Sequence, residues 1–511
     1  MIGSNPIVLT IDLGTQSVRA LLVNKEGSIL HKTQHVYEKP YYSLNPGWAE
    51  QKPEVYWNGL CDVTNRMKKE AGDLWEKIIA ITTTTIRDTC LCVNKDGKPL
   101  RDFIVWLDKR ESQMVKPFPF IHNAIFNLIG MMDTAVLQKK ISACNWIIEN
   151  EPDVWEKTHK FIFMSGYLTY MLTGRLADST ANMIGHIPFN SKTRKWMGKT
   201  DLNRAIFDVE KEKLTELLEP GKTLGYISET AAVATGLPRG LPLIATGSDK
   251  GCETLGLSCL KPDSAAVSLG TTATLQFTIN KYMEPLPFIP AYPAVIKGHY
   301  NPEIQIYRGY WLVSWFKKEF AYREVARAAE INVAPEAILE KMILKIPPGS
   351  DGLIFQPYFT PGVIMPKSKG AIIGFTDKHT RAHVYKSIIE GINFALMDGL
   401  YTMQRRGRVK IKKLFLSSGG SQSSRGCQIT SNMFGLPAYR IQTYEAAGLG
   451  SSMVGFTAMG VHADINEAAK KMVHIKDEFL PDPKEREIYK SLFDKVFSKL
   501  FVKLLPFYRN L

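Results

Sequence analysis

A glycine–threonine turn occurs twice in this chain, each time between two strand-like runs and half the chain apart. Gly14-Thr15 lies in "IDLGTQSVRALLV" (11–23), and Gly270-Thr271 lies in "SLGTTATLQF" (268–277). Glycine allows the backbone to turn tightly and leaves room for a ligand beside it. Consecutive amide groups in such a turn form a concave anion site. The repeat therefore predicts two related domains, each with a hairpin whose turn binds phosphate in a shared cleft.

The length of the chain agrees with a two-domain organisation. A single hydrophobic core rarely extends beyond roughly 250–300 residues, and this chain has 511 residues. We place the boundary near residue 250, which gives domains 1–250 and 251–511. Strand-like and helical segments alternate along both halves, and this pattern is typical of α/β architecture.

The clearest local unit of this kind lies in the second half. The segment 379–406 has the 3.6-residue apolar period of a long helix that ends at Gly407. A strand, "KLFLSS" (413–418), a glycine turn and another helix follow. Such a β-turn-α unit is a common place to bind a nucleotide.

Composition excludes several classes of protein. The 45% hydrophobic and 22% charged residues are ordinary globular values. The first residues read as a buried strand and not as a signal peptide, and no run approaches the ~18 apolar residues of a membrane span. The seven cysteines are scattered without a CxxC pair, which excludes an obvious zinc site and indicates reduced thiols. We therefore expect a cytoplasmic protein without a membrane partner.

Two basic segments have alternative interpretations. The run "RRGRVKIKK" (405–413) contributes to a net charge of +14, but no aromatic residue and no nucleic-acid module accompany it. We interpret it as a solvated helix end and loop, and we expect no nucleic-acid partner. The amphipathic tail (483–507) is interpreted as packing on its own domain and not on a membrane. A general positive field favours an anionic substrate such as ATP.

Asp12 stands at the end of the first buried strand, immediately before the first turn. A buried carboxylate without a partner is costly, so a cation, a metal or a backbone cap is expected beside it. Near a nucleotide, Asp12 would suit hydrated Mg²⁺, and Arg19 on the second arm would suit a phosphate oxygen. The alternative is an Asp12–Arg19 pair that braces the hairpin, and the residues alone leave both open.

Asp249 repeats this pattern after the apolar strand in "LPLIATGSD" (241–249). A carboxylate at a strand end can accept the proton of an attacking hydroxyl. In phosphoryl transfer the transition state is loose, so positioning and charge stabilisation matter more than base strength. The alternative role is an N-cap for the following helix.

Other nucleotide and metal motifs are incomplete. "GKT" occurs at 198–200 and 221–223, but neither copy has the first glycine of a Walker A loop, so this is no P-loop enzyme. "GLGSSMVG" (448–455) follows no strand and indicates close helix packing. "HTRAH" (379–383) lacks the glutamate of HExxH and indicates a helix start.

With these features together, the chain resembles the FGGY family of carbohydrate kinases, which includes glycerol kinase, xylulokinase and ribulokinase. The resemblance rests on five stretches that occur in the order seen in the family and together span nearly the whole chain. Each stretch alone is weak evidence for the family, but the five in order are specific to it. They are "IDLGTQSVRALLV", "NPGWAEQKPEVYW", "GKPLRDFIVWLDKR", "TGSDKGCETLGLSCLKPDSAAVSLGTTATL" and "SSGGSQSSRGCQITSNMFGLPAY" with "EAAGLGSS".

The resemblance implies an actin/hexokinase-like (ribonuclease H-like) α/β fold of two duplicated domains around a central cleft. It also implies ATP and Mg²⁺ as cofactors, with Asp249 as catalytic base and Asp12 as the magnesium-associated aspartate. The nucleotide-binding residues fall into three sets. They are Gly14, Thr15 and Arg19 for the first phosphate site; Gly270, Thr271, Thr272 and Gly309 for the second; and Gly419, Gly420, Ser421 and Ser424 for adenosine.

The expected acceptor is a small sugar or polyol, but the resemblance does not name it. The acceptor would lie near Arg87 and Asp88, with Trp106, Asp108 and Arg110. "TIRDT" is closer to glycerol kinases, "WLDKR" is closer to pentulose kinases, and 357–370 departs from the Gly-Glu-Arg loop of many relatives. The enzyme class is a phosphotransferase with an alcohol acceptor; a homodimer is left open. The alternatives are an actin-fold ATP phosphohydrolase and a non-catalytic, nucleotide-dependent scaffold.

Overall fold

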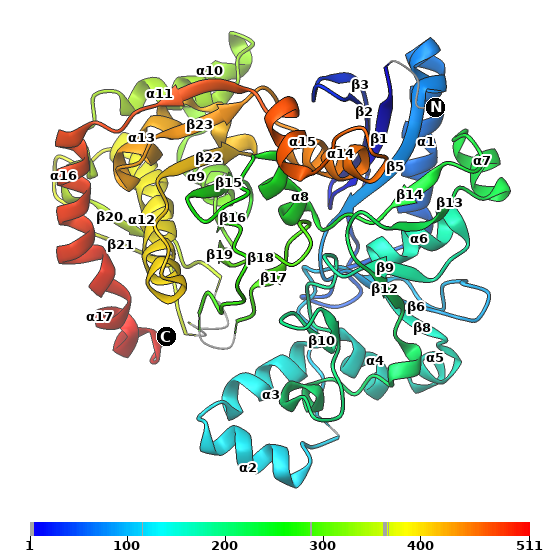
Figure 1. Ribbon diagram of the computed structural model, residues 1–511. Helices are drawn as coiled ribbons and strands as arrows, with labels where there is room; N and C mark the ends of the chain where they lie inside the picture. The colour runs from blue at the N-terminus through cyan, green and yellow to red at the C-terminus, as the bar shows by residue number, and fades with distance from the viewer. Residues whose placement is uncertain (1–4, 115, 287–288, 361–364, 366) are drawn as a thin grey trace. The chain divides into compact units, whose positions relative to one another are not determined.

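The computed structural model describes residues 5–114, 116–286, 289–360, 365 and 367–511 (Figure 1). The described chain forms two compact units. Unit 1 comprises Met1–Ser258, Tyr292–Tyr300 and Ala446–Val473. Unit 2 comprises Cys259–Ala291, Asn301–Glu445 and His474–Leu511. Each unit combines separate segments of the chain, and the simpler division near residue 250 stays a prediction.

Unit 1 is built on a six-stranded sheet in the order β13-β14-β5-β1-β2-β3. β1, β2 and β3 pair antiparallel, β1, β5 and β14 are parallel neighbours, and β13 returns antiparallel to β14. Every residue of β1 is buried, as expected for a strand covered on both faces. The bounds are β1 (Ile7–Leu13), β2 (Ser17–Asn24), β3 (Ile29–Val36), β5 (Ile78–Thr85), β13 (Thr223–Tyr226) and β14 (Pro242–Ile244).

Unit 2 repeats this topology in a sheet of order β19-β16-β15-β22-β23-β24. β15, β16 and β19 are antiparallel, β15, β22 and β23 are parallel, and β24 returns antiparallel. The two predicted hairpins, β1–β2 and β15–β16, hold equivalent places, which confirms the predicted duplication. The bounds are β15 (Ser264–Leu269), β16 (Ala273–Gln276), β19 (Glu303–Ile306), β22 (Lys413–Ser417), β23 (Ala438–Ile441) and β24 (Ile475–Phe479).

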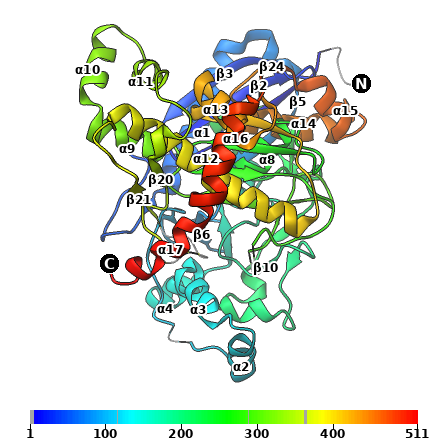
Figure 2. The same ribbon diagram turned by 90° about the vertical axis from the view of Figure 1, so that its left-hand side faces the viewer.

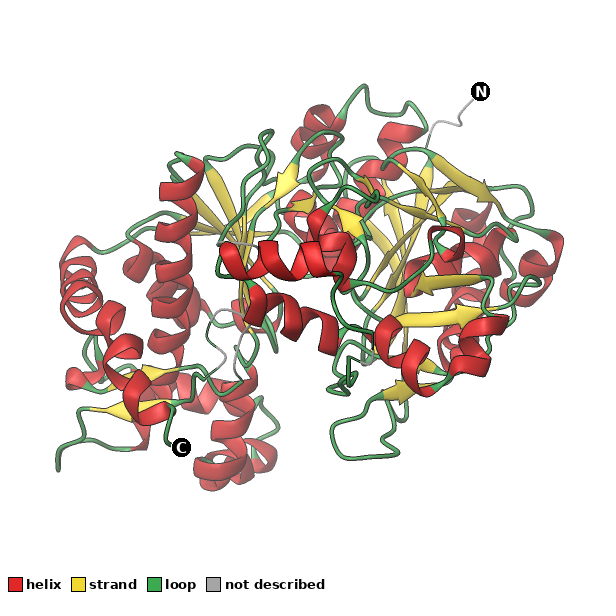
Figure 3. Ribbon diagram, turned by 90° about the horizontal axis from the view of Figure 1, so that it is seen from below, coloured by secondary structure: helices red, strands yellow, loops and turns green. Residues whose placement is uncertain are grey.

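In both units the strands of the main sheet lie between helices (Figure 3). In unit 1, α1 packs on β2 and β3, while α14 packs on β1, β5 and α8. A Cβ on Gly256 of α8 would lie 1.9 Å from the Ala446 carbonyl oxygen, and one on Gly450 of α14 would lie 1.9 Å from that of Cys252. "GLGSSMVG" is therefore a close helix contact, as predicted. The helices are α1 (Pro53–Ala71), α6 (Met164–Thr173), α7 (Glu229–Thr235), α8 (Asp249–Gly256), α14 (Ala446–Ala458) and α15 (Ile465–Met472).

Unit 1 also contains a smaller four-stranded sheet, in the order β4-β7-β6-β8, with four short helices and two two-stranded sheets. The strands of the smaller sheet are β4 (Glu50–Gln51), β6 (Cys90–Val93), β7 (Phe103–Ile104) and β8 (Lys160–Phe163). The helices are α2 (Phe120–Leu128), α3 (Met132–Ile141), α4 (Ala143–Asn150) and α5 (Pro152–Lys157). The two-stranded sheets are β9 (Ala177–Ser179) with β12 (Glu216–Leu218), and β10 (Phe189–Asn190) with β11 (Lys195–Trp196). A further pair is β17 (Tyr292–Pro293) with β18 (Tyr300–Asn301), of which residues 292–300 belong to unit 1.

In unit 2 the predicted long helix is α12 (Arg381–Gly407), which packs on β16 and β19. Thr380 caps its first turn, and the ring of His383 reaches back to the Thr380 backbone, so "HTRAH" is a helix start, as predicted. The predicted β-turn-α unit is β22, a turn and α13 (Ser424–Phe434). The remaining elements are α9 (Trp311–Phe320), α10 (Tyr322–Glu330), α11 (Pro335–Ile343), β20 (Ile354–Gln356) and β21 (Ala371–Ile373).

The C-terminal tail is helical and packs on its own unit, as predicted (Figure 2). It consists of α16 (Pro483–Leu492), a π-helical turn (Phe493–Phe497) and α17 (Ser498–Tyr508). The Phe394 ring of α12 lies 5.1 Å from the ring of Phe497, centroid to centroid. Across the described ranges, no helix combines the length and the apolar character that crossing a membrane requires.

Candidate active site

The carboxyl ends of three parallel strands bring the charged candidate residues of unit 1 together. β1, β5 and β14 lie side by side in the sheet, and Asp12 is the register partner of Thr84 near their ends. Arg87 and Asp88 follow β5, and Asp249 follows β14. In α/β sheets, ligands bind beyond the carboxyl ends of the strands. The topology thus places Asp12, Arg87, Asp88 and Asp249 at one edge.

Asp12 and Arg19 face each other across the first hairpin. They are direct register partners, and Arg19 Nη1 lies 3.2 Å from Asp12 Oδ2. The Asp12 side chain is 11% exposed and that of Arg19 is 35% exposed. The bracing pair is therefore present. Within the described ranges no three His, Cys, Asp or Glu side chains form a metal cluster. A magnesium ion beside Asp12 stays a prediction.

The first turn is polar and tied to the segment that carries Trp106. The Gly14 N–H donates to the Ser17 carbonyl (2.9 Å), which closes the hairpin. Trp106 Nε1 donates to Thr15 Oγ1 (2.9 Å). A Cβ on Gly14 would meet its nearest atom, the Ser17 carbonyl oxygen, at 3.4 Å. Packing thus leaves room for a side chain at Gly14, and phosphate binding by this turn stays a prediction.

Asp249 is the first residue of α8, but it does not cap that helix. The N-cap is Ser248, whose Oγ accepts from the Gly251 N–H (3.3 Å). The N-cap interpretation of Asp249 is therefore wrong, since the preceding serine has that role. Asp249 Oδ1 accepts from the Lys250 N–H (2.8 Å) and lies 3.6 Å from Arg87 Nε. The Asp249 side chain is 33% exposed, and its role as the catalytic base stays a prediction.

Arg87 is held from two sides. Its side chain is 16% exposed and borders Asp249. The ring of Tyr292 lies 5.4 Å from the guanidinium carbon, within the range of a cation–π contact. Arg194 holds the segment around Tyr292 in unit 1 through the carbonyls of Ala294 and His299 (3.3 Å each). No motif pointed to Tyr292, because the proline-rich stretch before it lacks the pattern of a strand or a helix, although Tyr292 itself begins β17.

Asp88 has a partner that sequence reasoning missed. Its carboxylate accepts from the His186 backbone N–H (2.9 Å) and from His186 Nδ1 (2.6 Å). Burial alone would raise the pKa of Asp88, but the charge and hydrogen bonds of His186 bring this pKa below its usual value. Burial would lower the pKa of His186, and the carboxylate of Asp88 raises it. The two side chains therefore form a hydrogen-bonded pair in which each favours the charged form of the other.

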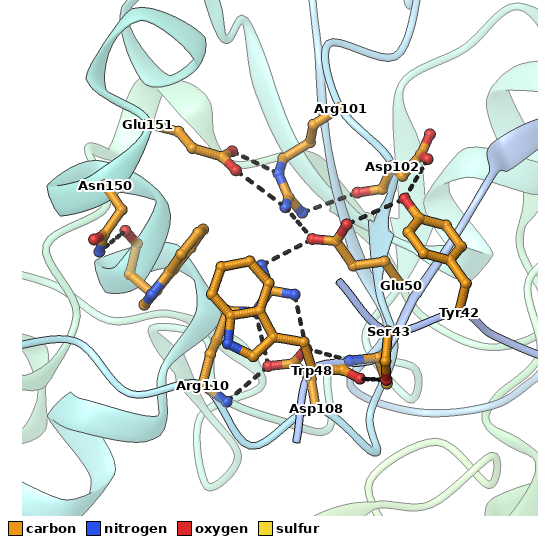
Figure 4. A network of polar contacts seen from close by, with 12 residues as sticks. Tyr42, Ser43, Trp48, Glu50, Arg101, Asp102, Asp108, Arg110, Asn150 and Glu151 are labelled. Atoms are coloured by element: carbon orange, nitrogen blue, oxygen red, sulfur yellow. Dashed lines mark hydrogen bonds and ion pairs between the residues drawn. The ribbon is translucent and has the colours of Figure 1, made fainter. Parts of the chain in front are cut away.

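Asp108 and Arg110 lie in a buried polar network (Figure 4). Asp108 accepts from the Ala49 N–H (2.6 Å) and from Arg110 Nε and Nη2 (2.8 Å each). The Arg110 guanidinium carbon lies 4.0 Å from the ring centroid of Trp48 and 4.5 Å from that of Trp146. The two charged side chains are 5% and 2% exposed. Their contacts are with protein groups, so they hold the segment that positions Trp106; acceptor binding by them stays a prediction.

A second arginine extends this network. Arg101 Nη2 lies 2.8 Å from Glu50 Oε1, and Arg101 Nε lies 2.7 Å from Glu151 Oε2. Arg110 Nη1 also lies 2.8 Å from Glu50 Oε1, so one carboxylate serves two arginines. Burial would lower the pKa of Arg101, but Glu151 and Glu50 raise it above its usual value. The network joins β4, the segment after β7, and the helices α4 and α5.

The second turn, in unit 2, is packed against the segment that carries Gly309. The Gly270 carbonyl accepts from the Tyr310 N–H (2.9 Å). Thr272 Oγ1 donates to the Tyr307 carbonyl (3.2 Å). A Cβ on Gly309 would lie 2.3 Å from the backbone nitrogen of Ala273, so packing requires glycine there. Gly309 therefore lies beside the second turn, as predicted. Thr271, at the tip of this turn, is exposed.

The predicted adenosine turn follows β22, the parallel neighbour of β15. Ser418 begins it with a φ of +66°. A Cβ on Gly420 would lie 2.4 Å from the Tyr310 ring, whereas one on Gly419 would have no heavy atom within 4 Å. Ser421 Oγ donates to the Ser418 carbonyl (2.8 Å). Packing therefore requires glycine at Gly420, and the Gly419 position is open.

Arg440 of β23 supports this turn through hydrogen bonds, and no sequence motif predicts this role. Its Nη1 donates to the Ser421 carbonyl (2.8 Å) and its Nη2 to Ser424 Oγ (3.0 Å). Asp477 of β24 accepts from Arg440 Nε (2.9 Å).

The segment 357–370, which departs from the family pattern, is described only in part. Residues 361–364 and 366 lie outside the described residues.

The structure thus assembles two groups of predicted residues, one in each unit. That both turns bind one triphosphate stays a prediction. The group in unit 1 is Asp12, Gly14, Thr15, Arg19, Arg87, Asp88, Trp106 and Asp249, with Asp108 and Arg110 in the supporting network. The group in unit 2 is Gly270, Thr271, Thr272, Gly309, Gly419, Gly420, Ser421 and Ser424.

The duplicated α/β fold with polar turns at the strand ends is one on which nucleotide-using proteins are built, and comparison with known proteins identifies the family. Residues 7–256 match the N-terminal domain of the FGGY family of carbohydrate kinases, and residues 265–459 match its C-terminal domain. The chain belongs to this family. It is a phosphotransferase with an alcohol group as acceptor.

Individual relatives agree with this assignment. The chain is 27% identical over 504 residues to the uncharacterized sugar kinase YgcE of Escherichia coli (strain K12), covering 97% of this chain and 94% of that protein. It is 24% identical over 494 residues to a xylulose kinase of Lactococcus lactis, covering 95% of each. The crystal structure of a gluconate kinase from Lactobacillus acidophilus superposes with a TM-score of 0.83 at 20% identity, covering 99% of this chain and 100% of that one. This structural likeness confirms the actin/hexokinase-like fold.

Proposed function

We propose that this protein is an ATP- and Mg²⁺-dependent kinase that phosphorylates a hydroxyl of a small sugar or polyol, with Asp249 as the general base. The observation that carries the proposal is the gathering of Asp12, Arg87, Asp88 and Asp249 at one edge of the sheet of unit 1. Family membership supplies the reaction class, and this edge supplies the charged groups that the reaction needs.

Asp249 is the group best suited to the acceptor hydroxyl. It is one-third exposed, and Arg87 borders it, with 3.6 Å between Arg87 Nε and Asp249 Oδ1. The carboxylate accepts the hydroxyl proton as the acceptor oxygen forms its bond to the γ-phosphorus. The bond from that phosphorus to the β–γ bridging oxygen breaks, and ADP leaves with the electron pair. Because the transition state is loose, holding the hydroxyl in line matters most.

The cation and the phosphates have fitting partners in the chain. Asp12 would hold Mg²⁺ through its waters, and the ion would neutralise charge that develops on the phosphates. Arg19 and the first turn would bind phosphate oxygens. In unit 2, the second turn would bind phosphate, and the turn around Gly419 would bind adenosine. Asp88 and Trp106 would bind the acceptor.

The test is an ATP-to-ADP assay of the purified protein with Mg²⁺ across ketopentoses, ketohexoses, polyols and aldonates. Similarity to a xylulose kinase and a gluconate kinase places ketopentoses and aldonates first. The expected result is ADP formation that depends on one class of acceptor, with the phosphorylated product seen by mass spectrometry. Turnover of ATP at full rate without acceptor would favour the phosphohydrolase, and filament formation without turnover would favour the scaffold.

Location and assembly belong to the same proposal. We propose a cytoplasmic enzyme without nucleic-acid or membrane partners, because relatives to which it is similar are kinases of small sugars such as xylulose. A homodimer is one assembly to be tested, and light scattering after size-exclusion chromatography distinguishes it from the monomer.

A further inference from the structure

His186 and Asp88 form a pair with an unusually demanding geometry. Asp88 has a φ of +51°, in the left-handed region that few residues other than glycine adopt. Gly185 has a φ of +144°, and a Cβ on it would lie 2.3 Å from Asp88 Oδ1. The backbone on both sides is therefore arranged so that the Asp88 carboxylate can approach the His186 amide. Strain of this kind persists only where the surrounding structure enforces it.

The pair orients the Asp88 carboxylate and leaves some of its hydrogen-bond acceptor positions unoccupied by His186. His186 N donates to Oδ1 (2.9 Å) and His186 Nδ1 to Oδ2 (2.6 Å), so each oxygen receives one hydrogen bond and the carboxylate plane is set. An ionised carboxylate offers about four acceptor positions. The side chains of Asp88 and His186 are 28% and 27% exposed, so acceptor positions remain for a ligand that donates hydrogen bonds. Sugar and polyol hydroxyls are such donors.

The segment that carries His186 also contacts the residues between β14 and Asp249. Ala181 forms a parallel β-bridge with Gly247, and the Ser248 N–H donates to the Ala181 carbonyl (3.4 Å). Ser179 Oγ donates to the Thr246 carbonyl (2.5 Å). One short stretch, 179–186, therefore links the loop before the proposed base with Asp88.

We propose that His186 is a positioning residue of the acceptor site, whose backbone N–H and ring Nδ1–H orient the Asp88 carboxylate to accept hydrogen bonds from the hydroxyls of the sugar or polyol. This inference rests on the proposed kinase function and adds a residue to its acceptor site.

Two substitutions separate the donor role of the ring from its bulk. His186→Asn keeps a side-chain N–H close to the position of Nδ1, and His186→Leu keeps a similar volume without a donor. His35→Leu is the matched control, because His35 Nδ1 pairs with Asp62 Oδ2 (2.9 Å) between β3 and α1, where both side chains are 38% exposed. The enzyme is assayed with the acceptor identified in the panel, and thermal unfolding verifies that each variant is folded.

For His186→Leu we expect a rise of about 10- to 100-fold in the KM of the acceptor, as for the loss of a charge-assisted hydrogen bond, with the KM of ATP unchanged. His186→Asn should stay within about threefold of the wild type, and His35→Leu should match it. An unchanged acceptor KM in His186→Leu, an equal rise in the KM of ATP, or equal impairment of the Asn and Leu variants would overturn the proposal.

A second pair of variants applies if His186→Leu does not fold. His186→Gln moves the amide donor one bond further out, so a wild-type-like Asn variant beside an impaired Gln variant supports the positioning role, and equal acceptor KM values contradict it. Absence of turnover by the wild-type enzyme on every acceptor is a different result. It would reject the proposed function itself and this inference with it.

Discussion

The two strand-end regions share a topology and differ in chemistry. In unit 1 the ends of β1, β5 and β14 carry charged groups, namely Asp12, Arg87, Asp88 and Asp249. In unit 2 the ends of β15 and β22, which correspond to those of β1 and β5, carry glycine, serine and threonine, and Arg440 within β23 donates to the turn after β22. One scaffold was duplicated, and the side chains at its ends then diverged. The difference suggests that unit 1 holds the reacting groups while unit 2 binds the nucleotide through its backbone.

The largest effect should come from the proposed base. Asp249→Asn keeps the size of the side chain and removes its ability to accept a proton, so kcat should fall by about 10²–10⁴-fold. The KM of ATP should stay near the wild-type value if unit 2 dominates nucleotide binding. Steady-state kinetics with the best acceptor measures both constants. Near-normal turnover would remove Asp249 from the mechanism.

The supporting network of unit 1 should contribute mainly to stability. Arg110→Leu leaves Glu50 and Asp108 buried without one of their partners, and such a loss costs about 3–5 kcal/mol of unfolding free energy. Arg66→Leu is the control, because Arg66 pairs with Asp62 on the surface at 3.0 Å and should cost less than about 1 kcal/mol. Denaturant unfolding of both variants gives the comparison. Similar costs would mean that the buried network contributes no more than a surface pair.

The pH dependence of stability should reveal a buried carboxylate beside the site of unit 1. Burial raises the pKa of Asp178 to about 6 from its ordinary value of 3.8, despite hydrogen bonds from Ser165 and Asn182. The folded state therefore favours the protonated acid. This contribution is fully present below about pH 4 and is lost as the pH rises through about 6, by about 2–3 kcal/mol in total.

Asp178→Asn tests this dependence, because the amide cannot ionise. The stability difference between wild type and variant, measured by denaturant unfolding at several pH values between 4 and 7, should shift against the wild type as the pH rises. Glu390→Gln provides the counterpart in unit 2, where burial also raises the pKa of Glu390. A difference that stays constant with pH would show that Asp178 is ionised throughout.

The smallest effects should come from the glycines of the unit 2 turn, and they separate packing from binding. Gly419→Ala meets no heavy atom within 4 Å, whereas Gly420→Ala places a Cβ 2.4 Å from the Tyr310 ring. Gly419→Ala should therefore leave the unfolding midpoint unchanged and raise the KM of ATP by a few fold, about 1 kcal/mol or less. Gly420→Ala should lower the unfolding midpoint. An unaffected KM in Gly419→Ala would contradict a ligand at this position.

Much of the fold and part of the site could be predicted from the sequence. The two hairpins, the helix 381–407 and the β22-turn-α13 unit have local signals, since glycine turns and apolar periods act over a few residues. Those same signals placed Asp12 and Asp249 at strand ends. The N-cap interpretation of Asp249 was wrong because two adjacent polar residues compete for one cap, and only the backbone geometry selects Ser248.

The sequence by itself determined the duplication, the class of fold and the identity of most strand-end residues, because these depend on patterns that repeat within short windows. The tertiary structure decided which distant groups meet: His186 with Asp88, Tyr292 with Arg87, Trp106 with Thr15, and Arg110 with Trp48 and Trp146. Such pairings depend on how separate segments pack, and hydrogen bonds and ring contacts act only over a few ångströms. No local pattern in the chain encodes that proximity.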